Sequence, residues 1–342
     1  MPDKLLRTVK EKVNSRKRKI SDRDDPVRFV GQTNLEKMAV SAVVGRDYFK
    51  RMTDFRSFVK LKKLKLAPPM SRLDTAFCWY LNSLFEQGLE YGEGSKCLAA
   101  VIDSFPGCGP RHQLPRSRRA LQGWQKQDPQ RTRPPLPWSL VASMVMSMLE
   151  RNMVHHAAMI MLMFSAYVRP GEAYNLQKVD LVAPMPGHQW FSLHLHPAER
   201  QETSKVGLSD ESLFLDATYI PWLGKALATL DSPDQFLFNV QYTSLVSVWK
   251  QALLHLGLPT SHAILYQLRH SGPSHDRLHR LRSALAVKQR GRWMADSSVI
   301  RHETHARVHA EFHHLPKKVQ NKCLLDEKRL EKEGPRFFGL KA

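Results

Sequence analysis

The chain has 342 residues, enough for about two domains, and 42% of its residues are hydrophobic while 25% are charged. This composition excludes a wholly disordered chain, because it supplies enough apolar residues for a core. Lys and Arg number 52 against 32 Asp and Glu, which gives a formal net charge of +20. A chain this basic is expected to bind a polyanion, either nucleic acid or an anionic membrane surface.

Residues 1–34 are polar and contain the basic run from Arg16 to Lys19, which predicts a flexible basic arm. Such a run serves as a nuclear address or a DNA contact in some proteins and is simply a solvated tail in others, and both readings stay open. The N-terminus lacks the apolar segment of a signal peptide, and no apolar run reaches the roughly 18–20 residues of a membrane span. We therefore expect a nuclear or cytoplasmic protein that is not secreted and does not enter a membrane.

Residues 35–110 carry apolar side chains at helical spacing from Met38 to Leu61, from Leu73 to Leu89 and from Leu98 to Ile102. This pattern predicts a small domain of four helices. Residues 111–137 follow as a connector rich in arginine, with Trp124 among the cations and prolines at its end. Basic residues with an interleaved aromatic suit a segment that follows phosphates, although a linker between domains would have the same composition.

Residues 138–315 are predicted to form a second domain, mainly α-helical with a small antiparallel sheet. Trp138 to Val168 has a strongly helical, methionine-rich pattern, and the segments 190–196 and 211–216 alternate as strands do. Helices are expected over 221–230, 242–256 and the basic stretch 264–292. Residues 316–342 are predicted to be a charged, helix-prone tail.

The chemistry of the chain is expected to need no metal and no small-molecule cofactor. The sequence has no phosphate-binding P-loop, no GxGxxG, no GxSxG and no HExxH motif. The pairs His275/His279 and His302/His305 have no nearby cysteine, as a zinc site would require. The cysteines are scattered without a disulfide pattern, so we expect reduced thiols.

Two arginines lie in apolar surroundings, where arginine is rare unless it serves a partner. Arg169 follows the apolar run MIMLMFSAYV, and Arg269 follows the run from Ile264 to Leu268. Two guanidinium groups held by rigid elements could bind one phosphate. The alternative for each is a structural salt bridge, for example between Arg169 and Glu172.

Four segments in chain order resemble the motifs of the tyrosine recombinases, the phage-integrase-like family. Residues 163–180 are similar to the box around its first catalytic arginine, and Thr203 to Gly207 to its hairpin with a catalytic lysine. Residues 265–270 resemble its HxxR box, and Arg290 to Trp293 its later His/Trp position. The resemblance covers about residues 35–315 and is strongest to the eukaryotic Crypton- or retroelement-like branch. It implies a helical core-binding domain followed by a catalytic domain.

The resemblance implies DNA strand cleavage through a covalent 3′-phosphotyrosine, in recombination or integration of a mobile element. Arg169 and Arg269 would neutralise the phosphate oxygens as charge builds in the transition state. Lys205 would protonate the leaving 5′-oxygen, and Trp293 would hydrogen-bond the phosphate through its indole N–H. The partner would be double-stranded DNA, and several copies of the chain could assemble on it. Eight further basic residues are candidate DNA contacts: Lys60, Lys62, Lys63, Arg116, Arg118, Arg119, Arg290 and Arg292.

Two supporting residues and two departures complete this expected site. Glu172 and His270 would orient the catalytic side chains. Tyr266 stands where the family has the histidine of HxxR, so a phenol replaces an imidazole. His302 stands nine residues after Trp293, where the family has its nucleophilic tyrosine, and no tyrosine follows Tyr266.

Several readings of this departure stay open. The chain could be a degenerate recombinase that binds DNA without cutting it, or His302 could itself attack phosphorus. A tyrosine could also come from another subunit. Outside the recombinases, the alternatives are a basic nucleic-acid-binding adaptor and a helical scaffold for an acidic protein.

Overall fold

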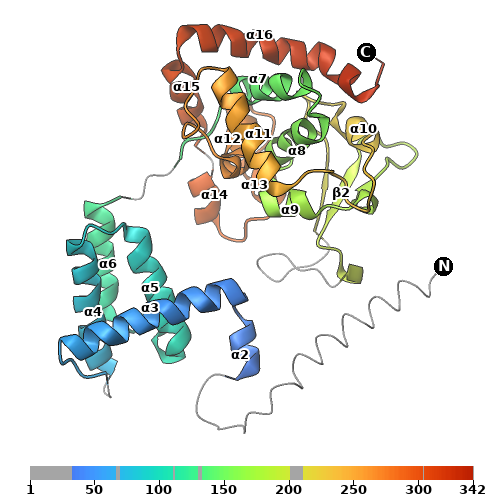
Figure 1. The fold of residues 1–342 in the computed structure, drawn as a ribbon. Helices are drawn as coiled ribbons and strands as arrows, with labels where there is room; N and C mark the ends of the chain where they lie inside the picture. The colour runs from blue at the N-terminus through green and yellow to red at the C-terminus, as the bar shows by residue number, and fades with distance from the viewer. Residues whose placement is uncertain are drawn as a thin grey trace. The chain divides into compact units, whose positions relative to one another are not determined.

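The computed structural model describes residues 33–66, 70–110, 112–129, 133–200, 211–302 and 304–341. The chain divides into two compact units between Thr132 and Arg133, within the segment predicted to be a linker. Each unit is described by itself below (Figure 1). The basic arm predicted over residues 1–34 lies almost entirely outside the described residues.

Unit 1 is built from helices, as the sequence predicts. Two of them begin at hydroxyl caps: Thr33 accepts the N–H of Glu36, and Ser41 accepts that of Val44. The described elements are α2 (Asn34–Met38), α3 (Ala42–Leu61), α4 (Met70–Glu86), α5 (Tyr91–Ser104), the short 3₁₀ helix η1 (Pro106–Cys108) and α6 (Pro115–Gln127).

The core of unit 1 includes a helix that was predicted to be part of a basic linker. Helix α6 buries Leu121 and Trp124 in the same core as Phe55 and Phe77. At its start, Ser117 donates its backbone N–H at 2.9 Å and its hydroxyl at 2.7 Å to the buried carboxylate of Asp74 on α4. The buried Leu121 and Trp124 and the hydrogen bonds to Asp74 hold α6 in place, and the arginines of α6 lie around these residues. Residues 115–127 therefore belong to unit 1.

Unit 2 contains helices and a small sheet. Its elements are α7 (Trp138–Leu149), α8 (Val154–Ser165), α9 (Pro170–Asn175), η2 (Lys178–Asp180), β1 (Leu181–Val182), β2 (Ser192–Leu195), η3 (Ala198–Arg200), β3 (Glu211–Phe214), α10 (Leu223–Ala228), α11 (Tyr242–His255), η4 (Leu265–Gln267), α12 (Leu268–Leu278), α13 (Ala284–Gly291), α14 (Asp296–His302), α15 (His305–His314), α16 (Lys317–Glu333) and η5 (Gly334–Phe338). No helix in the described ranges is long and apolar enough to cross a membrane.

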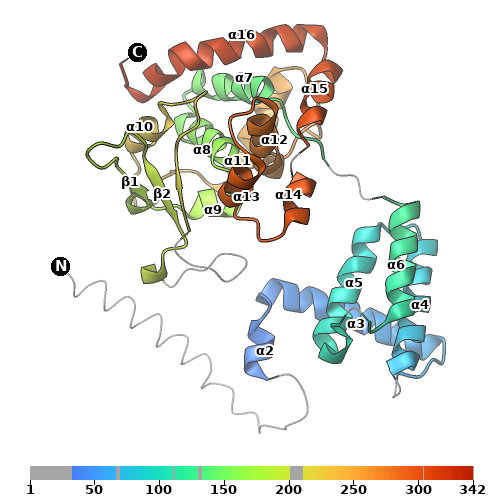
Figure 2. The ribbon, with the colours of Figure 1, turned by 180° about the vertical axis from the view of Figure 1, so that it is seen from behind.

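The sheet of unit 2 is antiparallel, with the strand order β1-β2-β3. Figure 2 shows β1 and β2. Leu193 on β2 pairs with Leu181 on β1 and with Leu213 on β3, and Leu195 is buried on the same face of β2 as Leu193. The second and third strands were predicted, whereas the two-residue β1 is too short to show alternation. The predicted mainly α-helical class with a small antiparallel sheet is confirmed.

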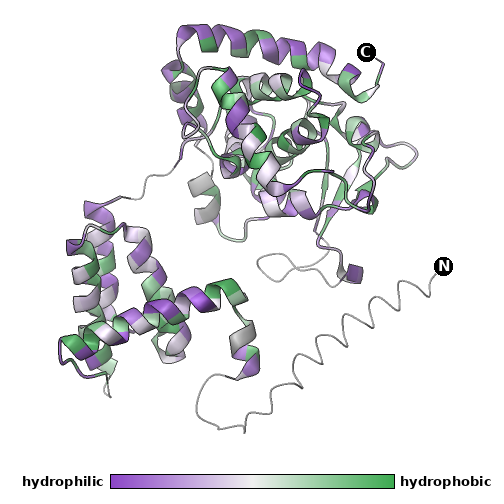
Figure 3. Ribbon diagram, viewed as in Figure 1, coloured by the Kyte–Doolittle hydropathy of each residue, from purple (hydrophilic) through white to green (hydrophobic). Residues whose placement is uncertain are grey.

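Helices α7 and α8 form the centre of unit 2 and are buried around almost their whole circumference. Helix α16 packs on α7 and buries Cys323 and Leu330, while its other positions are mostly hydrophilic (Figure 3). Residues 317–333 were predicted to be part of a charged tail, and the structure instead makes them an outer layer of the core. Helix α12 approaches α8 closely, since a Cβ on Gly272 would lie 2.0 Å from the carbonyl oxygen of Phe164.

Candidate functional site

Arg169 is positioned by the turn that ends α8. Tyr167 has a left-handed backbone with φ of 55°, which is uncommon for a bulky residue. Arg169 then occupies the N-cap of α9, and Pro170 takes the first helical position, where proline's fixed φ suits the helix. The carboxylate of Glu172 accepts the backbone N–H of Arg169 at 2.8 Å and also pairs with its guanidinium. The salt bridge considered from the sequence is therefore present.

The carboxylate of Glu172 is the centre of a group of basic side chains, which we call the Glu172 cluster: Arg169, His196, Arg269 and Arg292. Arg292 Nη2 lies 2.5 Å and Arg269 Nη1 lies 3.9 Å from Glu172 Oε2. His196 Nε2 lies 3.7 Å from Oε1. Only 6% of the Glu172 side chain is exposed, so these charges meet where water screens them little. One carboxylate thus faces three guanidinium groups.

The electrostatics of the cluster leave an excess of positive charge. Burial alone would raise the pKa of Glu172, but Arg292, the backbone N–H of Arg169 and its guanidinium outweigh burial and hold this pKa below its usual value. Burial, with Arg169 and Arg292 nearby, lowers the pKa of Arg269 to about 10, so Arg269 stays charged at neutral pH. The second carboxylate, Glu211, lies 3.0 Å from Arg292 Nε. Three guanidinium charges therefore oppose two carboxylates.

The cluster also has unused hydrogen-bond capacity. Among the described residues, no hydrogen-bond partner is found for the buried Nη1 of Arg292 or the buried Nε2 of His196. A tetrahedral oxyanion such as a phosphate accepts several hydrogen bonds and carries the charge that the cluster lacks. The described ranges hold no group of three or more His, Cys, Asp and Glu side chains that could bind a metal ion. The arrangement is suited to binding an anion.

Arg169 and Arg269 differ in what they can reach. The Arg269 side chain is 1% exposed, and its guanidinium donates to the carbonyl oxygens of Tyr167 and, at 2.7 Å, Gly291. The Arg169 side chain is 23% exposed and lies at the edge of the cluster. Arg169 can therefore contact a ligand directly, whereas Arg269 acts mainly through its charge.

Trp293, a residue of the predicted site, lies beside the cluster. Its ring stacks on Tyr167 with 6.4 Å between ring centroids and 17° between planes. The Arg269 guanidinium carbon lies 5.4 Å from the centroid of the Trp293 ring, in cation–π range. Trp293 is 8% exposed, so much of its surface is used in packing.

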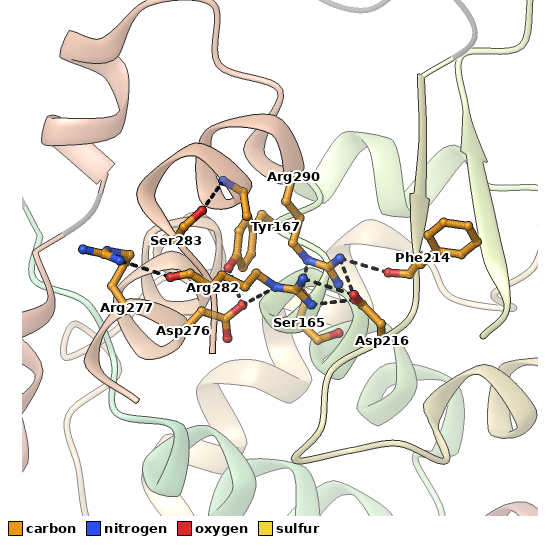
Figure 4. A network of polar contacts seen from close by, with 10 residues as sticks. Ser165, Tyr167, Phe214, Asp216, Asp276, Arg277, Arg282, Ser283 and Arg290 are labelled. Atoms are coloured by element: carbon orange, nitrogen blue, oxygen red, sulfur yellow. Dashed lines mark hydrogen bonds and ion pairs between the residues drawn. The ribbon is translucent and has the colours of Figure 1, made fainter. Parts of the chain in front are cut away.

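Tyr167, whose carbonyl oxygen accepts from Arg269, also belongs to a network of buried ion pairs and hydrogen bonds (Figure 4). Tyr167 donates its hydroxyl to Asp276 at 2.5 Å, and Arg282 binds both Asp276 at 2.8 Å and Asp216 at 2.6 Å. Arg290 donates to the carbonyl oxygens of Ser165 and Phe214 and pairs with Asp216 at 2.9 Å. Arg290 was predicted to contact DNA, but the structure shows its guanidinium bound within the protein. The network joins the ends of α8, β3, α12 and α13.

In the HxxR-like box, Tyr266 and His270 are less buried than Arg269, which lies between them in the sequence. Tyr266 is 43% exposed, and its ring centroid is 5.1 Å from that of His270. Burial and the neighbouring charge of Arg269 lower the pKa of His270 to about 4. His270 is therefore neutral at physiological pH, next to the cationic cluster.

Two predicted catalytic residues are not fully described. Lys205 lies in residues 201–210, outside the described residues. His302 is the last residue of α14, and its side chain is not among those described. The structure therefore brings together Arg169, Glu172, Arg269 and Trp293 from the predicted site, and it adds nothing on the other two.

The candidate DNA contacts of unit 1 differ in their surroundings. Five cationic side chains are exposed: Lys60, Lys62, Lys63, Arg116 and Arg119. Arg118 instead donates to the carbonyl oxygens of Gln113, Cys108 and Gly109, which fixes the loop before α6.

The sequence did not point to His196, a member of the cluster, or to Glu211, which pairs with Arg292. His196 follows β2 and Glu211 begins β3, so both flank the segment that carries Lys205. This position next to the lysine-bearing segment was the one signal available. Arg292 was predicted to contact DNA, and the structure places it in the cluster against Glu172.

No protein-family model and no curated protein matches the chain. Solved structures do match it. A lambda integrase dimer bound to a COC′ core site is 10% identical, with a TM-score of 0.51 over 80% of this chain and 75% of that chain. The Tn1549 transposon integrase in complex with transposon right-end DNA is 12% identical, with a TM-score of 0.50 over 80% of this chain and 94% of that chain.

These two matches include both the helical unit and the unit that contains the Glu172 cluster, because each extends over 80% of the chain. At 10–12% identity the likeness concerns the arrangement of the backbone. The chain has the fold of the tyrosine recombinases, as its sequence motifs predicted.

Proposed function

We propose that this protein binds double-stranded DNA as a tyrosine-recombinase-like protein, with the Glu172 cluster holding one backbone phosphate. The observation that carries the proposal is the convergence of Arg169, Arg269 and Arg292 on one buried carboxylate. A fold shared with integrases and a net charge of +20 support it. The resemblance adds a role in recombination or integration of a mobile element.

In this proposal the partly exposed Arg169 contacts the phosphate, and the buried Arg269 and Arg292 add positive charge without touching it. Fixed charges in a poorly screened site need no rearrangement when the anion arrives, so they favour it more than flexible surface lysines do. The exposed cations of unit 1 bind neighbouring phosphates. Several such contacts together would give a strong dependence on salt.

We further propose that DNA cleavage is impaired, because His302 replaces the tyrosine that the resemblance requires. In the complete reaction a phenol loses its proton and its oxygen bonds to phosphorus, the bond from phosphorus to the 5′-oxygen breaks, and Lys205 supplies the proton to that oxygen. Without the phenol, the charge-stabilising residues remain but the attacking oxygen is missing. Binding without cutting is the expected outcome.

Fluorescence anisotropy with a labelled duplex tests the binding proposal. Arg169→Ala should weaken binding about fivefold to tenfold and lower the salt slope by about 1, as expected for the loss of one phosphate contact. Arg307→Ala is the matched control, because this arginine of the same unit is 56% exposed and outside the cluster. Equal affinities for both variants would assign binding to scattered surface cations, which is the behaviour of a basic adaptor.

A nicked suicide duplex, which traps covalent intermediates, tests the cleavage proposal. The wild type should form no acid-stable adduct, and His302→Tyr should form one, since the phenol is then restored. An acid-stable adduct with the wild type would refute the proposal, because no tyrosine follows Tyr266 in the chain. His302→Phe, which adds a ring but no oxygen, is the control.

A further inference from the structure

A second charged feature of unit 2 lies away from the Glu172 cluster. A cavity of about 580 Å³ opens between the start of α10 and the C-terminal segment that follows α16. In Figures 1 and 2, α16 lies on the opposite side of unit 2 from α9, which carries Glu172. The cavity is thus separate from the proposed phosphate site, and its volume is within the range of ligand-binding pockets.

The walls of the cavity are apolar. Pro221 and Trp222 form one wall, and Pro335 and Leu340 belong to the other. The wall is firmly built at Trp222, whose ring centroid lies 5.7 Å from that of Phe338. A Cβ on Gly334 would lie 2.6 Å from Trp222 Cζ2, so the two walls are in close contact at this point. Such walls favour an apolar group in the cavity.

The rim of the cavity is strongly cationic. Lys225, Lys332, Arg336 and Lys341 line it, and Glu331 is its one acidic residue. All four cationic side chains are exposed, and none of them makes an ion pair with another described residue. The rim therefore lacks the negative charge that would balance it.

We propose that this cavity binds an acidic peptide segment of a partner protein, with an apolar side chain of the peptide between the walls and flanking carboxylates on the rim. The cations occupy both walls and recur at positions 332, 336 and 341, so several spaced carboxylates match them better than one small anion does. Duplex DNA fits poorly, because its convex backbone cannot place apolar surface inside a cavity. A peptide supplies both chemistries.

The test measures binding of three fluorescent probes to the full chain: a decapeptide with Leu and Phe flanked by Glu, the same peptide with Ser in place of Leu and Phe, and a duplex DNA. The first peptide should bind at least about fivefold more tightly than the second, because only the first buries apolar side chains. Equal affinity for both peptides would overturn the proposal, since general charge attraction would then explain the binding.

Charge reversal on the rim locates the site. The double variant Lys225→Glu, Arg336→Glu should lower affinity for the Leu/Phe peptide about tenfold or more, with DNA affinity unchanged. The double variant Lys318→Glu, Lys328→Glu is the matched control, because both lysines are exposed on α16 and do not line the cavity. Equal effects of the two double variants on peptide binding would refute the site. Loss of DNA binding with peptide binding intact would make the rim a DNA contact and would also refute it.

Discussion

Replacement of Glu172 by Gln removes the negative charge at the centre of the cluster and leaves the side-chain shape almost unchanged. The guanidinium groups of Arg169, Arg269 and Arg292 would then face one another across a neutral amide. Breaking a buried ion pair by neutralising one partner costs about 3–5 kcal/mol. Because 23% of the Arg169 side chain is exposed to water, we expect the lower end, about 3 kcal/mol.

Urea unfolding followed by tryptophan fluorescence measures this loss, since five of the seven tryptophans lie in unit 2. Glu150→Gln is the control, because Glu150 pairs with Arg329 at 2.8 Å but has 44% of its side chain exposed. That variant should lose less than about 1 kcal/mol. Sulfate or duplex DNA should then stabilise Glu172→Gln more than either the wild type or the control, because an anion can replace the missing carboxylate.

The pH dependence gives an independent check. The pKa of Glu172 is lowered in the folded protein, so the stability it contributes is present above about pH 4 and is lost as the pH falls through the folded-state pKa. The wild type should therefore lose stability in acid more steeply than Glu172→Gln. Two results would contradict an anion-binding role for the cluster. One is a Glu172→Gln variant as stable as the wild type at neutral pH, and the other is equal stabilisation of Glu172→Gln and Glu150→Gln by anions.

Three further outcomes test the surroundings of the cluster. Gly272→Ala should destabilise the protein by about 3 kcal/mol or more in thermal or urea unfolding, because the new Cβ would lie 2.0 Å from the Phe164 carbonyl oxygen. In the control, Gly171→Ala, the new Cβ meets no atom within 4 Å, so this variant should be nearly as stable as the wild type. Tyr167→Phe should cost about 1–3 kcal/mol, because it leaves the buried Asp276 carboxylate without its 2.5 Å donor. The pKa of His270 is lowered to about 4 in the folded protein, so protonation of this residue between about pH 6.5 and pH 4 favours unfolding. His270→Gln should therefore lose less stability than the wild type over this pH range, and an unchanged pH profile would contradict this.

Long apolar runs in the sequence predicted the central helices of the fold, whereas helices with only a thin apolar stripe were not predicted to be part of a core. The sequence of α7 and α8 is apolar on nearly all sides of each helix, so the sequence predicted both that this segment is helical and that it is buried. On α16 the buried positions form one thin stripe that includes Asp326, set among many charges. Helix α6 has only two buried apolar anchors, Leu121 and Trp124, among its arginines. Such segments become ordered through tertiary contacts that a local pattern does not display.

The site likewise contains residues that the local sequence could identify and residues that it could not. Arg169 and Arg269 could be found because a charge in an apolar frame is locally unusual. Arg290 and Arg292 lie two residues apart in similar sequence, yet Arg290 binds Asp216 and Arg292 binds Glu172. That difference depends on the left-handed backbone of Arg292 and on carboxylates brought from distant parts of the chain, so the local sequence did not separate the two roles.

Binding a phosphate and cutting beside it make different demands on this architecture. Binding needs fixed positive charge, which in the proposed site Arg269 and Arg292 would supply from buried positions held by carbonyl oxygens and by Glu172. Cutting needs in addition an oxygen nucleophile aimed at phosphorus, and the chain has His302 where the resemblance places that group. The arginines are also part of the packing of unit 2, because they join α9, α12 and the residue after α13 through one carboxylate. The charges proposed to bind a phosphate are therefore also needed by the fold, whereas the nucleophile is a separate requirement that only the reaction makes.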